Sequence, residues 1–317
     1  MHLIIAYACA PQDWGPEAMQ GLHLPHLERL LTGMRLTQTL HSDEPLCPAM
    51  PHERVLARTL GFADTLHGPW AAWHSARSGQ TDARAQAWIT PCHWQIGMDQ
   101  VVMHPPQDLQ LDDSQSRQLL EAMQPYLQAD GLEVRWHDAL RWHASGALLE
   151  GLQSASLDRV IGANVKPWIT DGRCPPALRR LQSEMQMLLY THPVNDARAV
   201  RGLAPVNSFW VHGAGRWSAD MQQAATVEVR LLDALRRPSL QGVEQAWRQA
   251  WLEPDALLGE LPAPETLSLC GEHAAHTFEP QPPGGWQRLS RWLGRHQPLA
   301  ALDALRSADT ICPRLLR

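Results

Sequence analysis

The sequence predicts an α/β fold in which helices flank a mostly parallel sheet and a smaller α+β domain is inserted into the chain. The first observation is an apolar run at 2–9, HLIIAYAC, which is typical of a buried parallel strand. The second is the helical pattern that follows at 24–34. The third is the order strand, strand, helix, strand, strand between 87 and 170, which indicates a compact module of its own.

Composition places the chain among globular proteins, with 44% apolar and 19% charged residues. A net charge of −6 without a basic stripe argues against broad nucleic-acid binding. No apolar run approaches the length of a membrane span, so no membrane contact is expected. The first residues lack the basic start of a secretion signal and the six cysteines form no C-x-x-C pair, which predicts a cytoplasmic protein with reduced thiols.

In the first part of the chain, the run at 2–9 is expected to be the first strand of the sheet. Leucines at helical spacing after a proline predict a helix over 24–34, which a glycine ends. A second short helix is expected over 51–62, again ending at a glycine. Between 66 and 88 the pattern predicts no clear element.

The module begins with two strands in 87–104, joined around a glycine. The pattern in 112–131 predicts a helix with an acidic or serine N-cap, an apolar face and a glycine stop. Two further short strands follow at 132–138 and 140–145. The segment 166–176, rich in proline and glycine, is expected to be the exit linker.

The clearest helix is predicted at 177–192, where proline closes the pattern. A strand entering a tight glycine turn is expected at 206–215. Later strand and helix candidates lie at 226–235, 265–271 and 296–309, with a loop at 280–285. We therefore expect three sections: a first part of the core at 1–86, an inserted α+β domain at 87–176, and a return helix with the second part of the core at 177–317.

The stretch 191–216, THPVNDARAVRGLAPVNSFWVHGAGR, gathers amides, arginines and glycines in one place. Its GAGR turn at 213–216 would allow a backbone to approach a phosphate closely, and an arginine can hold a phosphate through two hydrogen bonds. The complete dinucleotide-binding pattern is absent, so on these residues alone a plain structural turn is favoured over an anion site.

This stretch resembles the archaeal-type cofactor-independent phosphoglycerate mutases of the alkaline phosphatase superfamily. A helix running into H-x-V-N-x-x-R, a spacer, P-x-N and a strand ending in G-x-G carry the resemblance, in His192, Val194, Asn195, Arg198, Pro205, Asn207, Gly213 and Gly215. It extends diffusely over 1–235 and implies an alkaline-phosphatase-like sheet. The residues it implies for substrate binding are Asn195, Arg198, Arg201, Asn207 and Arg216.

The sequence departs from that family at the expected reaction centre. Tyr7-Ala8 stands where the family's first strand ends in a metal-binding Asp-Gly. His52-Glu53 stands at the place of its Ser-Asp nucleophile motif. The region that should carry a D-x-x-x-H cluster reads LSLCGEHAAHTFEP, with histidines and no aspartate.

These departures favour a catalytically degenerate member with a phosphate-binding, phosphoester-binding or partner-binding regulatory role and no cofactor. The alternative is an active metal-dependent phosphoglycerate mutase or phosphoester hydrolase with rearranged ligands. It would use two divalent metals, Mn or Zn, with His52 as the catalytic candidate. Its metal candidates are Glu53, Glu272, His273 and His276. A third hypothesis is that the amides and arginines of 191–216 only join the two domains through hydrogen bonds.

Other histidines attract less specific interpretations. His273 and His276 form H-x-x-H, but no second metal motif accompanies them and loop histidines after a strand are the simpler interpretation. His93 and His104 flank one predicted strand pair, and His137 and His143 lie on the next. Exposed histidines on a sheet are the default interpretation of all four.

Overall fold

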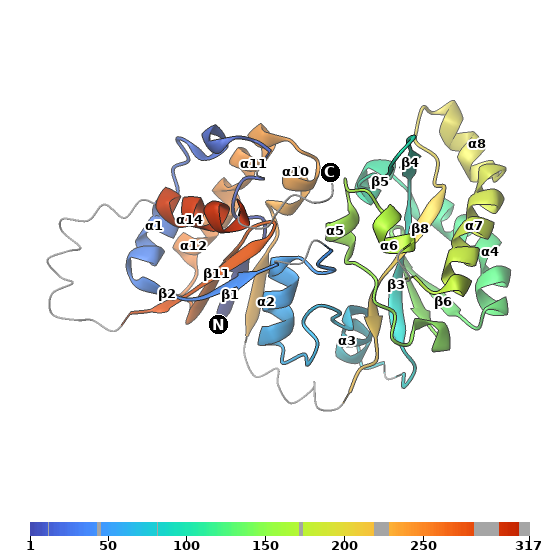
Figure 1. Ribbon diagram of the computed structural model, residues 1–317, viewed down its shortest axis with the longest axis horizontal. Helices are drawn as coiled ribbons and strands as arrows, with labels where there is room; N and C mark the ends of the chain where they lie inside the picture. Colours follow the sequence, from blue (N-terminus) through green and yellow to red (C-terminus); the bar gives the residue numbers. More distant parts are fainter. Residues whose placement is uncertain are drawn as a thin grey trace, which may run out of the picture. The chain divides into compact units, whose positions relative to one another are not determined.

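The computed structural model describes residues 1–11, 13–42, 46–80, 82–170, 174–218, 228–281 and 298–310. Its contacts divide the chain into two compact units (Figure 1). Unit 1 joins Met1–Thr65 to Met221–Leu315, and unit 2 consists mainly of the intervening Leu66–Asp220. Each unit combines one main sheet with several helices: the sheet of unit 1 is mixed, and that of unit 2 is antiparallel.

Unit 1 contains a five-stranded mixed sheet in the order β2-β11-β10-β1-β9. The interior strand β1 pairs in parallel with both β10 and β9, as expected for an apolar strand buried on both faces. The other two pairings, β10 with β11 and β11 with β2, are antiparallel. The strands are β1 (His2–Ile5), β2 (Met34–His41), β9 (Val229–Leu232), β10 (Thr266–Cys270) and β11 (Ala274–Pro280).

Helices of unit 1 pack on this sheet around a core that includes two buried tryptophans. Trp247 and Trp251 are completely buried together with Leu3, Ile5 and Leu27. The N-terminus of α1 receives a cap from far along the chain, because Asp255 accepts the Leu27 N–H at 2.9 Å. The helices are η1 (Pro16–Met19), α1 (Pro25–Thr32), α2 (Pro51–Thr59), α10 (Arg236–Leu240), α11 (Glu244–Ala250), α12 (Leu252–Glu260) and α14 (Pro298–Thr310).

Unit 2 contains a four-stranded antiparallel sheet in the order β6-β7-β3-β8 and a separate hairpin of β4 and β5. In β3, Ala87 and Ile89 enter the main core, so Gln86, Trp88 and Thr90 face the other side of the sheet. The strands are β3 (Gln86–Cys92), β4 (Trp94–Ile96), β5 (Val101–Met103), β6 (Glu133–Asp138), β7 (Arg141–Ser145) and β8 (Ser208–Gly215).

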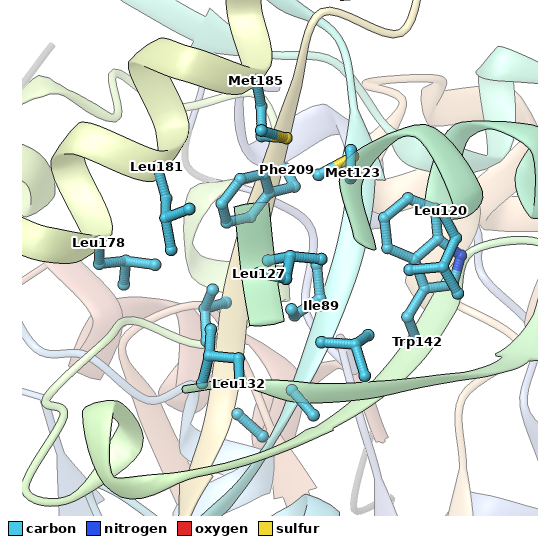
Figure 2. Close-up of a cluster of buried hydrophobic side chains, with 14 of the residues drawn as sticks. Ile89, Leu120, Met123, Leu127, Leu132, Trp142, Leu178, Leu181, Met185 and Phe209 are labelled. Carbon is cyan, nitrogen blue, oxygen red and sulfur yellow. The ribbon is translucent and has the colours of Figure 1, made fainter. Parts of the chain in front are cut away.

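The main core of unit 2 fills the space between this sheet and two long helices, α4 and α7 (Figure 2). Helix α4 brings Leu120, Met123 and Leu127 to meet Ile89 and Trp142 of the sheet. The helices of unit 2 are α3 (Trp70–Arg77), η2 (Pro106–Leu109), α4 (Asp113–Ala129), η3 (Ala147–Leu149), α5 (Leu157–Val160), α6 (Lys166–Thr170), α7 (Pro176–Tyr190) and α8 (Pro193–Val200).

The extent of unit 2 differs from the section we expected at 87–176. Helix α7 and strand β8 belong to unit 2, whereas the sequence led us to expect them with the larger sheet. The reason is their packing: Leu181 and Met185 of α7 lie in one cluster with Ile89 of β3 and Phe209 of β8 (Figure 2). Because β8 pairs with β3, the segment after α7 completes the sheet of unit 2.

Local elements agree with the sequence in most places. The helices expected at 24–34, 51–62, 112–131 and 177–192 form as α1, α2, α4 and α7. The strand expected at 2–9 ends earlier, at Ile5, since Tyr7 has a φ of 56°. The expected linker contains the short helix α6, and no expectation covered β2, α3 or α8.

Some expected segments fall partly outside the described residues. The loop at 280–285 is described only to 281, the strand candidate at 226–235 only from 228, and the terminal candidate at 296–309 only from 298. In the described part of the chain, no helix has the length and apolar character needed to cross a membrane.

Candidate functional site

The carboxyl ends of β1 and β10 lie side by side in unit 1, because the two strands are parallel. The chain leaves β1 in a tight conformation: Tyr7 has a φ of 56°, and Ala8 N–H donates to the Cys270 carbonyl at 2.8 Å. The Trp247 indole N–H also donates to the Tyr7 carbonyl at 2.9 Å. Positive φ is unusual for a tyrosine, so these contacts hold a conformation with intrinsic strain.

His52 meets this strand end from the first turn of α2. Its ring centroid lies 5.4 Å from that of Tyr7, with the planes tilted by 46°. Both side chains are buried, at 5% and 4% exposure. The residues at the places that the resemblance assigned to a metal ligand and a nucleophile therefore meet in space, but as a packed pair of rings.

Glu53, the neighbouring metal candidate, stabilises the helix start. Its carboxylate accepts the backbone N–H of Met50 at 2.7 Å and so forms part of a capping box at the N-terminus of α2. One oxygen of this carboxylate is thereby used for capping. The negative charge also complements the positive end of the helix.

The remaining candidates follow β10. Glu272 and His273 lie in the turn before β11, with 4.0 Å between the Glu272 Oε1 and His273 Nε2 atoms. His276 lies within β11 and is buried, and this burial lowers its pKa, with a further contribution from His41. His273 and His276 are therefore not an i, i+3 pair on a helix. Among the described residues, no group of three or more His, Cys, Asp or Glu side chains is arranged to hold a metal ion.

The substrate-binding candidates of 191–216 all lie in unit 2, and Asn195 is the most enclosed of the amides. Its Nδ2 donates to the carbonyls of Leu189 and Val206, both at 2.8 Å. Its Oδ1 accepts the Val206 N–H at 2.9 Å. Asn195 thus ties the end of α7 and the start of α8 to the segment that leads into β8.

Arg198 is completely buried and its guanidinium donates to three protein acceptors. Its Nε reaches the Ala204 carbonyl at 2.9 Å, and one terminal nitrogen reaches Gln115 Oε1 at 2.9 Å. The other terminal nitrogen donates to the Leu109 carbonyl at 2.5 Å. Burial, followed by the charge of Arg201, lowers the guanidinium pKa. The donors expected to hold phosphate are therefore directed at carbonyl and amide oxygens.

Asn207 and Arg216 also bond to protein groups. Asn207 makes two hydrogen bonds to one residue, accepting from Trp94 N at 2.7 Å and donating to Trp94 O at 2.9 Å. Arg216 donates to the Ala83 carbonyl at 2.9 Å and forms an ion pair with Glu150. Arg201, at the C-cap of α8, is exposed.

The glycines that the sequence placed in a tight turn lie instead in the last part of strand β8, which still pairs with β3 there, and their small size has a packing reason. Gly213 has a φ of 60°, and a Cβ there would lie 3.1 Å from the Cβ of Trp70. A Cβ at Gly215 would lie 2.8 Å from the Cβ of Pro69. Helix α3 begins at these two neighbours, so the glycines let its N-terminus approach β8 closely.

The sequence did not predict a histidine cluster that lies on the face of the unit 2 sheet opposite the main core. His74 of α3 and His137 of β6 lie 5.2 and 5.1 Å from the ring of Trp88, and 5.0 Å from each other, between centroids. His143 Nε2 lies 2.8 Å from Gln86 Oε1 and 3.0 Å from Ser75 Oγ. Burial lowers the pKa of His74 and His143, so neutral imidazoles are favoured. The alternation of the strands places 137 and 143 on one sheet, but nothing in the sequence places α3 over them.

Two solved structures are similar to this chain at low identity. One is a cofactor-independent phosphoglycerate mutase from Thermoplasma acidophilum, with 12% identity, a TM-score of 0.34, and coverage of 98% of this chain and 99% of that chain. The other is the PH0037 protein from Pyrococcus horikoshii, with 10% identity, a TM-score of 0.43, and 97% coverage of each chain. No protein-family model and no curated protein matches the sequence. Both likenesses are distant and extend over the whole chain.

Proposed function

We propose that this chain is a phosphoglycerate mutase-like protein that has lost mutase chemistry and acts by binding, in a regulatory role. The observation that supports it is the packed pair of Tyr7 and His52 beside the carboxyl ends of β1 and β10. Phosphoryl transfer at two metals needs carboxylates and imidazoles around the ions and a hydroxyl or water to receive the phosphoryl group. The Tyr7 and His52 rings are buried and pack against each other, so this pair is a poor substitute for the metal ligand and the nucleophile that the reaction needs.

The contacts around this pair support the same conclusion. Glu53 already accepts a backbone N–H with its carboxylate. Ala8 and Cys9 follow Tyr7 and are buried, so the residues after β1 present mainly apolar surface. A carboxylate placed here without a metal would be costly to bury, whereas these side chains pack without that penalty.

Between the two binding roles we propose the protein partner, because the contacts of 191–216 are unfavourable for a phosphorylated ligand. A phosphate would have to compete with the Leu109, Ala204 and Gln115 oxygens for the donors of Arg198. Breaking those bonds would leave the buried Leu109 carbonyl without its donor, which is unfavourable. Arg201 and Arg216 are exposed, so a phosphate would meet them as surface charges and gain little.

The test is an activity assay paired with a binding assay on the full chain. With Mn²⁺ or Zn²⁺ supplied, we expect neither 2- or 3-phosphoglycerate interconversion nor phosphoester hydrolysis above the rate of His52→Ala. Phosphate and 3-phosphoglycerate should leave the melting temperature unchanged, since a ligand that does not bind the native state does not stabilise it. Turnover that disappears in both His52→Ala and His273→Ala would overturn the proposal.

That outcome would favour the alternative, an active metal-dependent mutase or hydrolase with rearranged ligands. The Glu272–His273 pair beside the carboxyl end of β10 is the observation that supports this alternative. His273→Asn is the sharper variant for this purpose, since asparagine keeps a polar side chain of similar size. Loss of turnover and of Mn²⁺ binding together in this variant would assign a metal to the turn.

A further inference from the structure

His93 and His104 form a pair across the start of the β4–β5 hairpin in unit 2. His104 N–H donates to the His93 carbonyl at 3.0 Å, directly beside the Trp94–Met103 register pair. The two ring centroids are 5.1 Å apart and the planes are nearly perpendicular, at 85°. Both side chains are half-buried. Two imidazoles at this separation, each next to the end of a strand, are close enough to share one ion.

Each ring has one nitrogen occupied by an oxygen that can only accept. His93 Nδ1 lies 2.9 Å from the Pro205 carbonyl, so Nδ1 must carry the proton. His104 Nε2 lies 2.7 Å from Gln95 Oε1, and with the Gln95 amide in this orientation its oxygen accepts and Nε2 carries the proton. The unprotonated nitrogens are then His93 Nε2 and His104 Nδ1. This is the arrangement of metal-binding histidines, in which the other ring N–H donates to a carbonyl or carboxylate oxygen.

The backbone that supports His93 is fixed independently. Asn207 bonds to both N and O of Trp94, and Asn207 N–H donates to the Cys92 carbonyl at 3.2 Å. These contacts hold the segment that carries Pro205 against the residues on either side of His93. The P-x-N sequence therefore positions a histidine, and Asn207 is a positioning residue.

From these contacts we propose that His93 and His104 bind a borderline divalent cation such as Ni²⁺ or Zn²⁺ through His93 Nε2 and His104 Nδ1. Imidazole nitrogens suit these ions, and water would fill the other coordination positions. Burial lowers the pKa of His93, which keeps its ring neutral and its lone pair available near neutral pH. The nearby Arg198 charge opposes a cation, so the affinity should be modest. The inference concerns a place in unit 2 and does not depend on the proposed loss of mutase chemistry.

The experiment is a calorimetric titration of the full, untagged chain with Ni²⁺ near neutral pH. We expect the wild type to bind one Ni²⁺ per chain at this site. In His93→Gln and in His104→Gln this binding should be lost or its affinity should fall by at least about tenfold, since even changes to outer-shell partners cost about 10–100-fold in affinity. The matched control is His137→Gln, which removes one imidazole from the other edge-to-face pair, His74 and His137, at 5.0 Å. It should leave this binding unchanged.

A second comparison tests the assigned nitrogen of His104. Gln95→Glu replaces the amide oxygen with a carboxylate, which raises the basicity of the ring and should tighten Ni²⁺ binding severalfold. Gln100→Glu adds the same charge to the turn of the same hairpin and should change binding less. Equal effects of the two substitutions would overturn the assignment of His104 Nδ1. Binding that survives in His93→Gln and His104→Gln, or that is lost equally in His137→Gln, would overturn the site itself.

Discussion

Replacing Arg198 with alanine tests whether this arginine stabilises the fold or binds a ligand. The substitution removes a fully buried guanidinium and leaves the Leu109 and Ala204 carbonyls and Gln115 Oε1 without their donors. An unsatisfied buried acceptor costs about 1–3 kcal/mol. Gln115 can turn toward water and Ala204 is exposed, so the Leu109 carbonyl remains buried, and we expect a loss of about 2 kcal/mol in the free energy of unfolding.

The assay is urea denaturation followed by circular dichroism. With a slope of about 2 kcal/mol per molar, the midpoint of unit 2 unfolding should fall by about 1 M. Arg201→Ala is the matched control, because its exposed side chain should contribute less than about 0.5 kcal/mol. The reasoning is refuted if Arg198→Ala keeps the wild-type midpoint while it abolishes a stabilisation by phosphate that the wild type shows.

Three further predictions concern stability. Gly213→Ala should destabilise unit 2 by about 1–3 kcal/mol in thermal or urea unfolding, because the added Cβ strains a positive φ and lies close to Trp70. The control is Gly79→Ala, which has a similar φ of 73° but no atom within 4 Å of the added Cβ, and it should cost less. Equal losses of stability in the two variants would exclude a contribution from the Trp70 contact. Asp255→Ala should cost about 1 kcal/mol in unit 1 by removing the cap of Leu27, a loss that Asp255→Asn should partly restore. Burial, followed by the charge of the chain's N-terminus, lowers the pKa of His2 to about 4, so the unfolded state binds its proton first, and stability should fall as the pH drops from about 6.5 to about 4 and then level off. His2→Gln should flatten that part of the urea-midpoint profile, and an unchanged profile would contradict the role of His2.

The elements that the sequence predicted well are those with strong local signals. Helix α4 has an aspartate cap, an apolar face and a glycine stop, and Asp112 accepts the Gln115 N–H as the pattern requires. Strand β2 has no such signal, since most of its side chains are exposed and its ladder partner is β11. Helix α3 is short, and its position depends on close packing against Gly213 and Gly215.

The candidate site shows the same division between local and long-range information. The sequence drew attention to Asn195, Arg198 and Asn207, and the structure gives each of them several hydrogen bonds. Their partners include Gln115 and Trp94, which lie 83 and 113 positions away along the chain. The same motif can place an arginine against a backbone carbonyl or against a phosphate. The spacing of residues in the sequence therefore could not show which of the two Arg198 contacts.

In both units the candidate residues pack against or bond to other parts of the protein. In unit 1 the end of β1 packs a tyrosine ring against His52, and in unit 2 the arginine of the H-x-V-N-x-x-R stretch bonds to carbonyls. The donors of Arg198 are satisfied by protein oxygens, so the arrangement in unit 2 does not require a bound phosphate to be stable. A phosphoryl-transfer site has the opposite property, because it holds charged groups apart for a substrate and metal ions to complete. If Arg198→Ala weakens folding and phosphate does not affect the wild type, the stretch that carries the strongest resemblance to the mutases contributes here to packing and to the position of His93.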